Sequence, residues 1–127
     1  MMPDTPQPDP GAAPAAQPTP PSRPPTIHEA KRDSGPSGAV LYGAELDLPA
    51  AVARRQGGLD VVVRGNDTDA NRRLAQAIEA AVGSTPIRQT PHRRAGPLAL
   101  PHYQQDAPPP EGHTFYETEH RKARRKR

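Results

Sequence analysis

The sequence contains no cysteine and no tryptophan, and only one of its 127 residues is phenylalanine. The missing cysteines exclude disulfide bonds and thiolate metal ligands. No apolar run approaches the roughly 18 residues that a membrane-spanning helix needs, so we expect no membrane partner. The N-terminus lacks the basic start and apolar stretch of a secretory signal peptide. We therefore expect a cytoplasmic protein, or one exported by a route that needs no cleavable signal peptide.

Proline is abundant but unevenly placed, since 11 of the 19 prolines lie within the first 36 residues. Proline removes backbone donors and holds the chain extended, so a segment this rich in proline, alanine and glutamine buries little surface. We expect residues 1–38 to form a disordered linker. A docking peptide for a proline-binding module is the alternative interpretation of this segment.

Charge is also unevenly distributed. Residues 39–116 carry eight basic and eight acidic side chains, whereas residues 117–127 carry six basic and two acidic ones. A neutral body argues against a broad nucleic-acid-binding face, while a basic end favours local attraction to phosphate. The expected organisation is a small domain over residues 39–117 and a basic tail over residues 118–127.

The clearest structural pattern lies in residues 59–83. Three consecutive valines, 61–63, predict a buried central strand, because β-branched residues favour strands and an unbroken apolar run indicates burial on both faces. Asp67 or Thr68 is suited to cap the following helix, and Gly83 to end it. Carboxylates in this turn would repel phosphate, so it is not a nucleotide-binding loop.

A second, shorter helix is predicted after Asp47, with Pro49 in its first turn and Gly57 at its end. Leu48 is expected to face the core. Short apolar runs at 39–42, 98–104 and 113–117 predict further strands. These elements predict an α+β fold in which two helices pack on a three- to five-stranded, mainly antiparallel sheet.

The residues with the greatest chemical potential follow the second helix. His102 and His113 lie in two late predicted strands and would approach each other if these strands pair. Two imidazoles near neutral pKa can divide the work of general base and general acid. An arginine pair nearby would hold a phosphodiester, and a hydroxyl would orient it or donate a proton. The candidate set is His92, Arg93, Arg94, His102, His113, Thr114 and Tyr116.

Two other interpretations of these histidines stay open. A histidine beside proline in a loop is usually solvated, so the three can be scattered by chance. A zinc site through His92, His102 and His113 has neither a cysteine nor an HExxH spacing to support it. We expect no cofactor.

Two short segments, Leu-Pro-His-Tyr-Gln (100–104) and Gly-His-Thr-Phe-Tyr-Glu (112–117), carry a resemblance to a known class of proteins. With the strand and helix before them, they resemble the small C-terminal toxin domains of bacterial polymorphic toxin systems. The metal-independent ribonucleases related to barnase, EndoU and RelE are similar in bearing His, Arg and hydroxyl residues on a sheet. The resemblance implies that His102 and His113 are the acid and base, and that Arg88, Arg93 or Arg94 faces phosphate.

The sequence thus predicts a small toxin-type ribonuclease with histidine acid/base catalysis, RNA as substrate and an immunity or antitoxin protein as a possible partner. The alternative is a non-enzymatic α+β interaction module. Its proline-rich leader would bind a protein, and its basic tail would bind RNA or an acidic surface.

Overall fold

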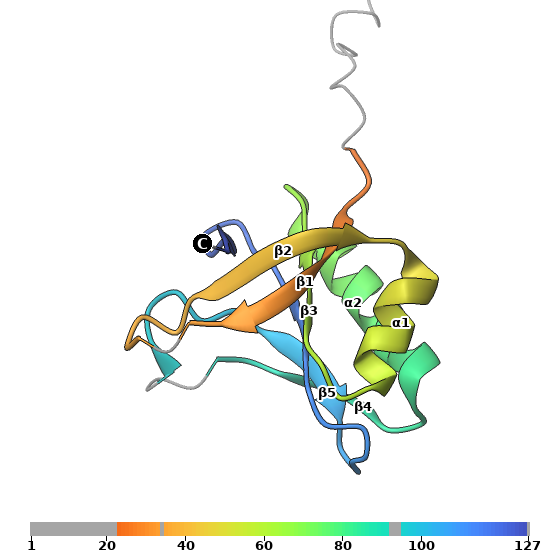
Figure 1. Ribbon diagram of the computed structural model, residues 1–127. Helices are drawn as coiled ribbons and strands as arrows, with labels where there is room; N and C mark the ends of the chain where they lie inside the picture. Colours follow the sequence, from red (N-terminus) through yellow and green to blue (C-terminus); the bar gives the residue numbers. More distant parts are fainter. Residues whose placement is uncertain (1–22, 34, 92–94, 127) are drawn as a thin grey trace, which may run out of the picture.

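A computed structural model describes residues 23–33, 35–91 and 95–126 of the chain (Figure 1). The described part contains two helices and seven strands. In chain order the elements are β1 (Thr26–Arg32), β2 (Val40–Leu46), α1 (Leu48–Gln56), β3 (Val61–Arg64), α2 (Thr68–Val82), β4 (Pro86–Gln89), β5 (His102–Gln105), β6 (Thr114–Tyr116) and β7 (Arg124–Arg125). The fold is α+β, as the sequence predicts.

The seven strands form one sheet in the order β4-β5-β6-β3-β1-β2-β7. The valine strand β3 lies at its centre, which confirms the prediction for residues 61–63. The predicted strand number, three to five, is wrong. The sheet is also mixed, because β3–β6 and β2–β7 pair in parallel while β1–β2, β1–β3, β4–β5 and β5–β6 pair antiparallel.

Two strands, β1 and β7, lie in the segments that the sequence analysis assigned to a linker and a tail. β1 occupies residues 26–32 and pairs with both β2 and β3. No proline interrupts this strand, and Ile27 and Ala30 are buried, so the proline-rich composition of residues 1–38 concealed a strand at the middle of the sheet. β7 adds the exposed Arg124 and Arg125 to the edge beside β2.

Both helices lie on the same side of the sheet (Figure 1). The Asp47 side chain accepts a hydrogen bond from the backbone N–H of Ala50 at 2.9 Å and caps α1. The Asp67 side chain accepts from the N–H groups of residues 69 and 70 and caps α2. Gly57 and Gly83 follow the last helical residues. The predicted ends of both helices are therefore confirmed.

The buried faces of the helices differ from the prediction. Leu48 was expected in the core, but as the first residue of α1 it is 45% exposed. Glu79 of α2 is fully buried, and so is Arg55 of α1. The two charged side chains form an ion pair between the helices, which is why neither faces solvent.

Each face of the sheet has its own apolar core. Under the helices, Ile27, Val61 and Val63 pack with Ile78 and Tyr116. On the other face, Val40, Val62 and Phe115 pack with Leu100 and Ala123. No helix of the described residues covers this second face, and coil around residues 95–101 and 117–123 supplies its outer layer. Side chains of β6 alternate between the two cores, since Phe115 and Tyr116 point to opposite faces.

Candidate functional site

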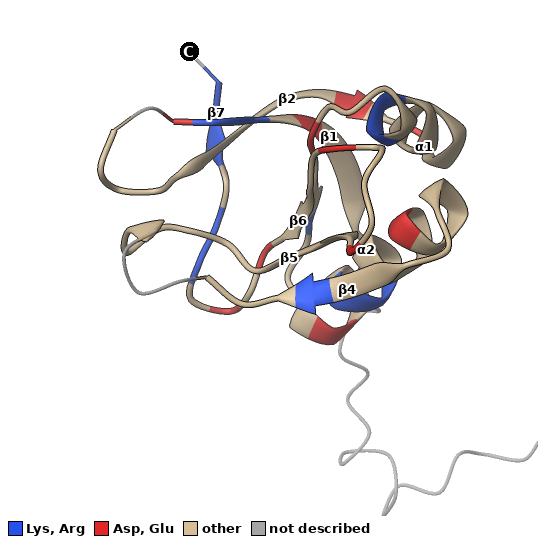
Figure 2. Ribbon diagram, turned by 90° about the horizontal axis from the view of Figure 1, so that it is seen from below, with Lys and Arg blue, Asp and Glu red and all other residues tan. Residues whose placement is uncertain are grey.

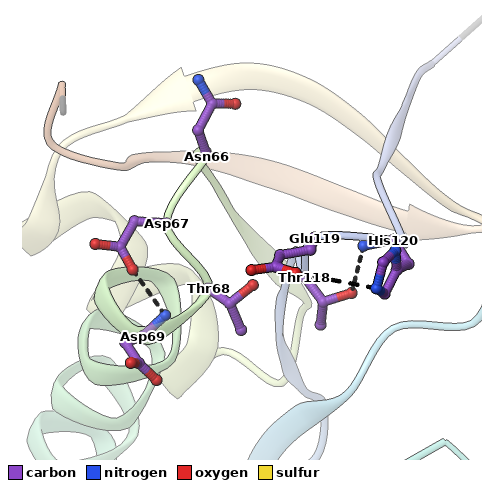
Figure 3. Close-up of a pocket in the computed structure, with 7 residues that line it drawn as sticks. All are labelled: Asn66, Asp67, Thr68, Asp69, Thr118, Glu119 and His120. Carbon is purple, nitrogen blue, oxygen red and sulfur yellow. Dashed lines mark hydrogen bonds and ion pairs between the residues drawn. The ribbon is translucent and has the colours of Figure 1, made fainter. Parts of the chain in front are cut away.

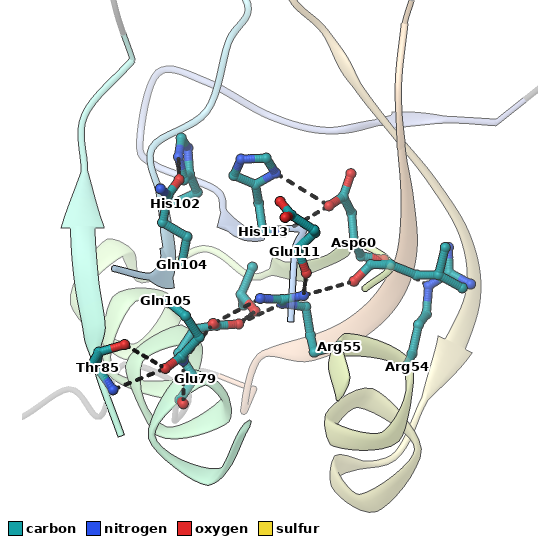
Figure 4. A network of polar contacts seen from close by, with 12 residues as sticks. Arg54, Arg55, Asp60, Glu79, Thr85, His102, Gln104, Gln105, Glu111 and His113 are labelled. Carbon is teal, nitrogen blue, oxygen red and sulfur yellow. Dashed lines mark hydrogen bonds and ion pairs between the residues drawn. The ribbon is translucent and has the colours of Figure 1, made fainter. Parts of the chain in front are cut away.

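Two histidines meet on the face of the sheet that carries no helix. β5 pairs antiparallel with β6, and His102 lies opposite Phe115 in this register. His113 directly precedes β6. The imidazole rings of His102 and His113 have centroids 4.6 Å apart and are nearly perpendicular, at 84° (Figure 4). Phe115 contacts both rings edge-on or tilted, with centroids 5.4 and 5.5 Å away. The structure therefore brings the two predicted acid/base candidates together.

Asp60 holds His113 in place. β3 and β6 pair in parallel with Val61 opposite Thr114, so the residues that precede these strands, Asp60 and His113, are neighbours. One carboxylate oxygen of Asp60 accepts a hydrogen bond from the backbone N–H of His113 at 2.8 Å and lies 3.3 Å from its Nδ1. Burial raises the pKa of Asp60, but the hydrogen bonds and charge of His113 outweigh it, and the pKa lies below its ordinary value. An ionised Asp60 favours a proton on Nδ1 of His113.

His102 has a different environment. Its Nε2 lies 3.0 Å from the side-chain oxygen of Gln104, two residues along the same strand face. Its Nδ1 is buried and has no hydrogen-bond partner among the described residues. Burial, and then the nearby His113, lower the pKa of His102 below its ordinary value of 6.5. The two histidines are thus unequal, because His102 is kept neutral while His113 is placed against a carboxylate.

A cleft of about 580 Å³ opens beside His102, and we call it the His cleft. Arg32, the last residue of β1, lines this cleft, and its positive charge acts on both Asp60 and His102. Asp33 contributes an opposing carboxylate to the same lining. The lining of the His cleft includes Arg32, Gln89, Thr90, Pro91, His102 and Gln104.

A buried polar network fixes the two strands that carry the histidines (Figure 4). The Arg55 guanidinium donates to both carboxylate oxygens of Glu79, at 2.6 and 2.9 Å. Glu79 also accepts from Thr114 of β6 at 2.5 Å and from Gln105 of β5 at 3.0 Å. Arg55 further donates to the carbonyl oxygen of Glu111 at 2.6 Å. Thr114 and Gln105 each adjoin a residue of the site, so the network sets the positions of His113 and Gln104 from beneath the sheet.

Tyr116 and Arg88 lie apart from the histidine pair. Tyr116 points under the helices, whereas His102 and His113 occupy the opposite face. Arg88 lines a second cleft together with Tyr116. The expectation that Tyr116 acts on the same bond as the histidines is therefore wrong, because residues 113 and 116 differ by an odd number along a strand.

The predicted substrate-binding residues His92, Arg93 and Arg94 lie outside the described residues. Within residues 23–33, 35–91 and 95–126, no group of three or more His, Asp or Glu side chains could hold a metal ion. The same residues include no helix long and apolar enough to cross a membrane.

A shallow hollow at the start of α2 is negatively charged (Figure 3). Asp67, Asp69 and Glu119 line it, together with the exposed His120. Three carboxylates around one hollow repel phosphate, so this part of the surface is not a path for nucleic acid.

The sequence analysis missed two members of the site. Asp60 was not among the candidate residues, although it directly precedes the valine strand as His113 directly precedes β6. Arg32 was assigned to the linker. Asp60 and Arg32 can be placed at the site only when the pairing of β3 with β1 and with β6 is known. These pairings join residues that lie far apart in the chain.

Comparison of the chain with protein-family models, with curated proteins and with solved structures gave no match in any of the three.

Proposed function

We propose that the protein cleaves RNA without a metal ion, through general acid/base catalysis by His102 and His113. The observation that supports this proposal best is the pair itself. The two imidazoles stand 4.6 Å apart, His102 lines the His cleft, and only His113, which lies behind His102, is bonded to a carboxylate. Such an unequal pair provides one proton acceptor and one proton donor at neutral pH.

The environments assign the two roles. His102, with its lowered pKa, accepts the proton of the ribose 2′-hydroxyl at Nε2. This step requires the substrate to displace the Gln104 oxygen, to which Nε2 donates in the free protein, and the proton of the neutral ring to lie on the buried Nδ1. The 2′-oxygen then attacks phosphorus and the bond from phosphorus to the 5′-oxygen breaks. His113 donates its proton to that leaving oxygen. The products are a 2′,3′-cyclic phosphate and a free 5′-hydroxyl, and one proton has moved from substrate to His102 while another has left His113.

Arg32 and Asp60 support this step. Arg32 lines the His cleft and would face the phosphate oxygens, whose negative charge grows as the 2′-oxygen attacks. Asp60 is a positioning residue, since its carboxylate orients the ring of His113. Arg32 takes the part that the sequence analysis gave to Arg88, Arg93 or Arg94.

The first test is incubation of the full chain with single-stranded RNA and a chelator. Substituting His102→Gln or His113→Gln removes one proton-transfer group, so each rate should fall by about 100- to 10,000-fold. Glutamine keeps a polar group of similar size, and circular dichroism checks that each variant is folded. The matched control is His120→Gln, which changes an exposed histidine outside the His cleft and should leave the rate unchanged. Equal rates in all variants, or no cleavage by the folded parent chain, contradict the proposal.

We extend the proposal to a toxin-type role, for which the support is the resemblance of residues 59–117 to small bacterial toxin domains. A nuclease of this kind needs an inhibitor in the cell that makes it. An immunity or antitoxin protein that covers the His cleft would supply that protection.

A second candidate function is a non-enzymatic interaction module. The observation in its favour is the basic edge of the sheet, where Arg124, Arg125 and Lys126 are exposed (Figure 2). This edge would attract RNA or an acidic protein surface. The RNA incubation distinguishes the two functions, because binding without cleavage favours the module.

A further inference from the structure

A second cleft of about 570 Å³, here called the Arg cleft, lies where α2, β4 and the coil after β6 meet. Three arginines from these three segments line it: Arg72, Arg88 and Arg121. The single carboxylate in its lining is Asp69, so three positive charges face one negative charge and leave two positive charges in excess. Figure 2 shows one basic position on β4.

The three arginines differ in the hydrogen bonds that they already make within the protein. Arg72 donates to Asp69 at 3.3 Å, and Arg121 donates to the carbonyl oxygen of Ala99 at 2.7 Å, which leaves other N–H groups on each guanidinium. Arg88 is exposed on β4. The buried Tyr116 contributes its side chain to the same wall. Burial raises the pKa of Tyr116, although the Arg88 charge opposes it, so the hydroxyl keeps its proton and can donate a hydrogen bond.

The Arg cleft and the His cleft meet at β4. Thr90 and Pro91 line both clefts, so the short segment that follows Gln89 is their common rim. A nucleic-acid backbone that passes over this rim would reach the histidines on one side and the arginines on the other. Guanidinium groups are well suited to phosphate, because their planar N–H donors match two of its oxygens.

We propose that the Arg cleft binds a backbone phosphate of the same single-stranded RNA, at a position beyond the phosphate that is cleaved. This inference rests on the proposed function for the identity of the ligand. It implies that a dinucleotide occupies only the His cleft, whereas a longer strand occupies both and binds more tightly.

The test measures binding separately from cleavage. A fluorescent 2′-O-methyl RNA of roughly eight nucleotides, which cannot be cleaved, is titrated with the full chain. Arg88→Gln should weaken binding about tenfold, the effect of losing one charge-assisted contact. The matched control is Arg73→Gln, which removes the same charge from the exposed face of α2 outside the Arg cleft and should change binding less than about twofold.

Cleavage assays complete the test. Arg88→Gln should leave the rate on a dinucleotide unchanged and lower kcat/KM on the longer strand. If Arg88→Gln and Arg73→Gln behave alike in binding while the parent chain cleaves RNA, the Arg cleft is not a phosphate site and the proposed function stands. If the RNA binds in an Arg88-dependent way and is never cleaved, the phosphate site is supported and the nuclease proposal fails.

Discussion

Replacing Arg55 with methionine should lower the free energy of unfolding by about 3–5 kcal/mol, the cost of leaving a buried charge without its partner. Arg55 and Glu79 are both fully buried, and Glu79 holds Thr114 and Gln105 as well. Methionine fills similar space but removes every donor of the guanidinium. A loss of this size is comparable to the whole stability of many small domains, so thermal and urea unfolding should both shift strongly.

Arg54 provides the matched control for Arg55. It is the preceding residue and carries the same charge, but its side chain is 24% exposed and its contact with Glu29 is 3.9 Å long. It also donates one hydrogen bond to the Asp60 carbonyl oxygen. Arg54→Met should therefore cost only about 1 kcal/mol. Equal urea midpoints for Arg55→Met and Arg54→Met would contradict a stabilising role of the buried network.

A chain shortened to begin at Gly35 should lose its cooperative unfolding transition. The deletion removes β1, which pairs with β2 on one side and with β3 on the other, and it removes the buried Ile27 and Ala30. Without β1, the strands β2 and β7 have no described ladder to the rest of the sheet. Urea denaturation followed by circular dichroism measures the transition.

The control for this deletion is a chain that begins at Arg23, which keeps every strand of the described sheet and should unfold cooperatively. A chain beginning at Gly35 that unfolds at the same midpoint as this control would show that β1 is dispensable. The comparison also tests whether the folded domain begins with β1, as in the structure, or after residue 38, as the composition suggested.

The parts of this fold that could be predicted from sequence are those determined locally. Asp47 and Asp67 cap helices through hydrogen bonds to residues two or three positions later, and glycines end both helices. The valine run of β3 indicates burial through its own composition. The meeting of His102 and His113 was predictable from two neighbouring strands that form an antiparallel pair.

The remaining features depend on contacts between distant residues. Arg55 and Glu79 are 24 positions apart, and each alone has the pattern of a solvated helix residue. Asp60 and His113 are 53 positions apart and meet only because β3 and β6 run parallel. β1 is surrounded by prolines in the sequence, so composition averaged over residues 1–38 hid its seven residues. Periodicity and composition carry no information on such pairings.

The histidine site depends on this distant architecture. The polar network beneath the sheet ties β5 and β6 to both helices, and the parallel register brings Asp60 to one histidine only. A general base and a general acid need different environments to work at one pH. The fold supplies two different environments to the adjacent imidazole rings of His102 and His113.

The most direct test of this assignment uses a substrate whose leaving group needs no proton. Uridine 3′-(4-nitrophenyl phosphate) releases nitrophenolate, which is stable as an anion, so the general acid becomes unnecessary while the general base is still required. The measurement is the initial rate of the full chain, His102→Gln and His113→Gln on this substrate and on RNA. If His113 is the acid, His113→Gln should be slow on RNA and within about tenfold of the parent on the nitrophenyl substrate, whereas His102→Gln should be slow on both. Equal losses on both substrates for His113→Gln, or rescue of His102→Gln in its place, would contradict the assignment of acid and base.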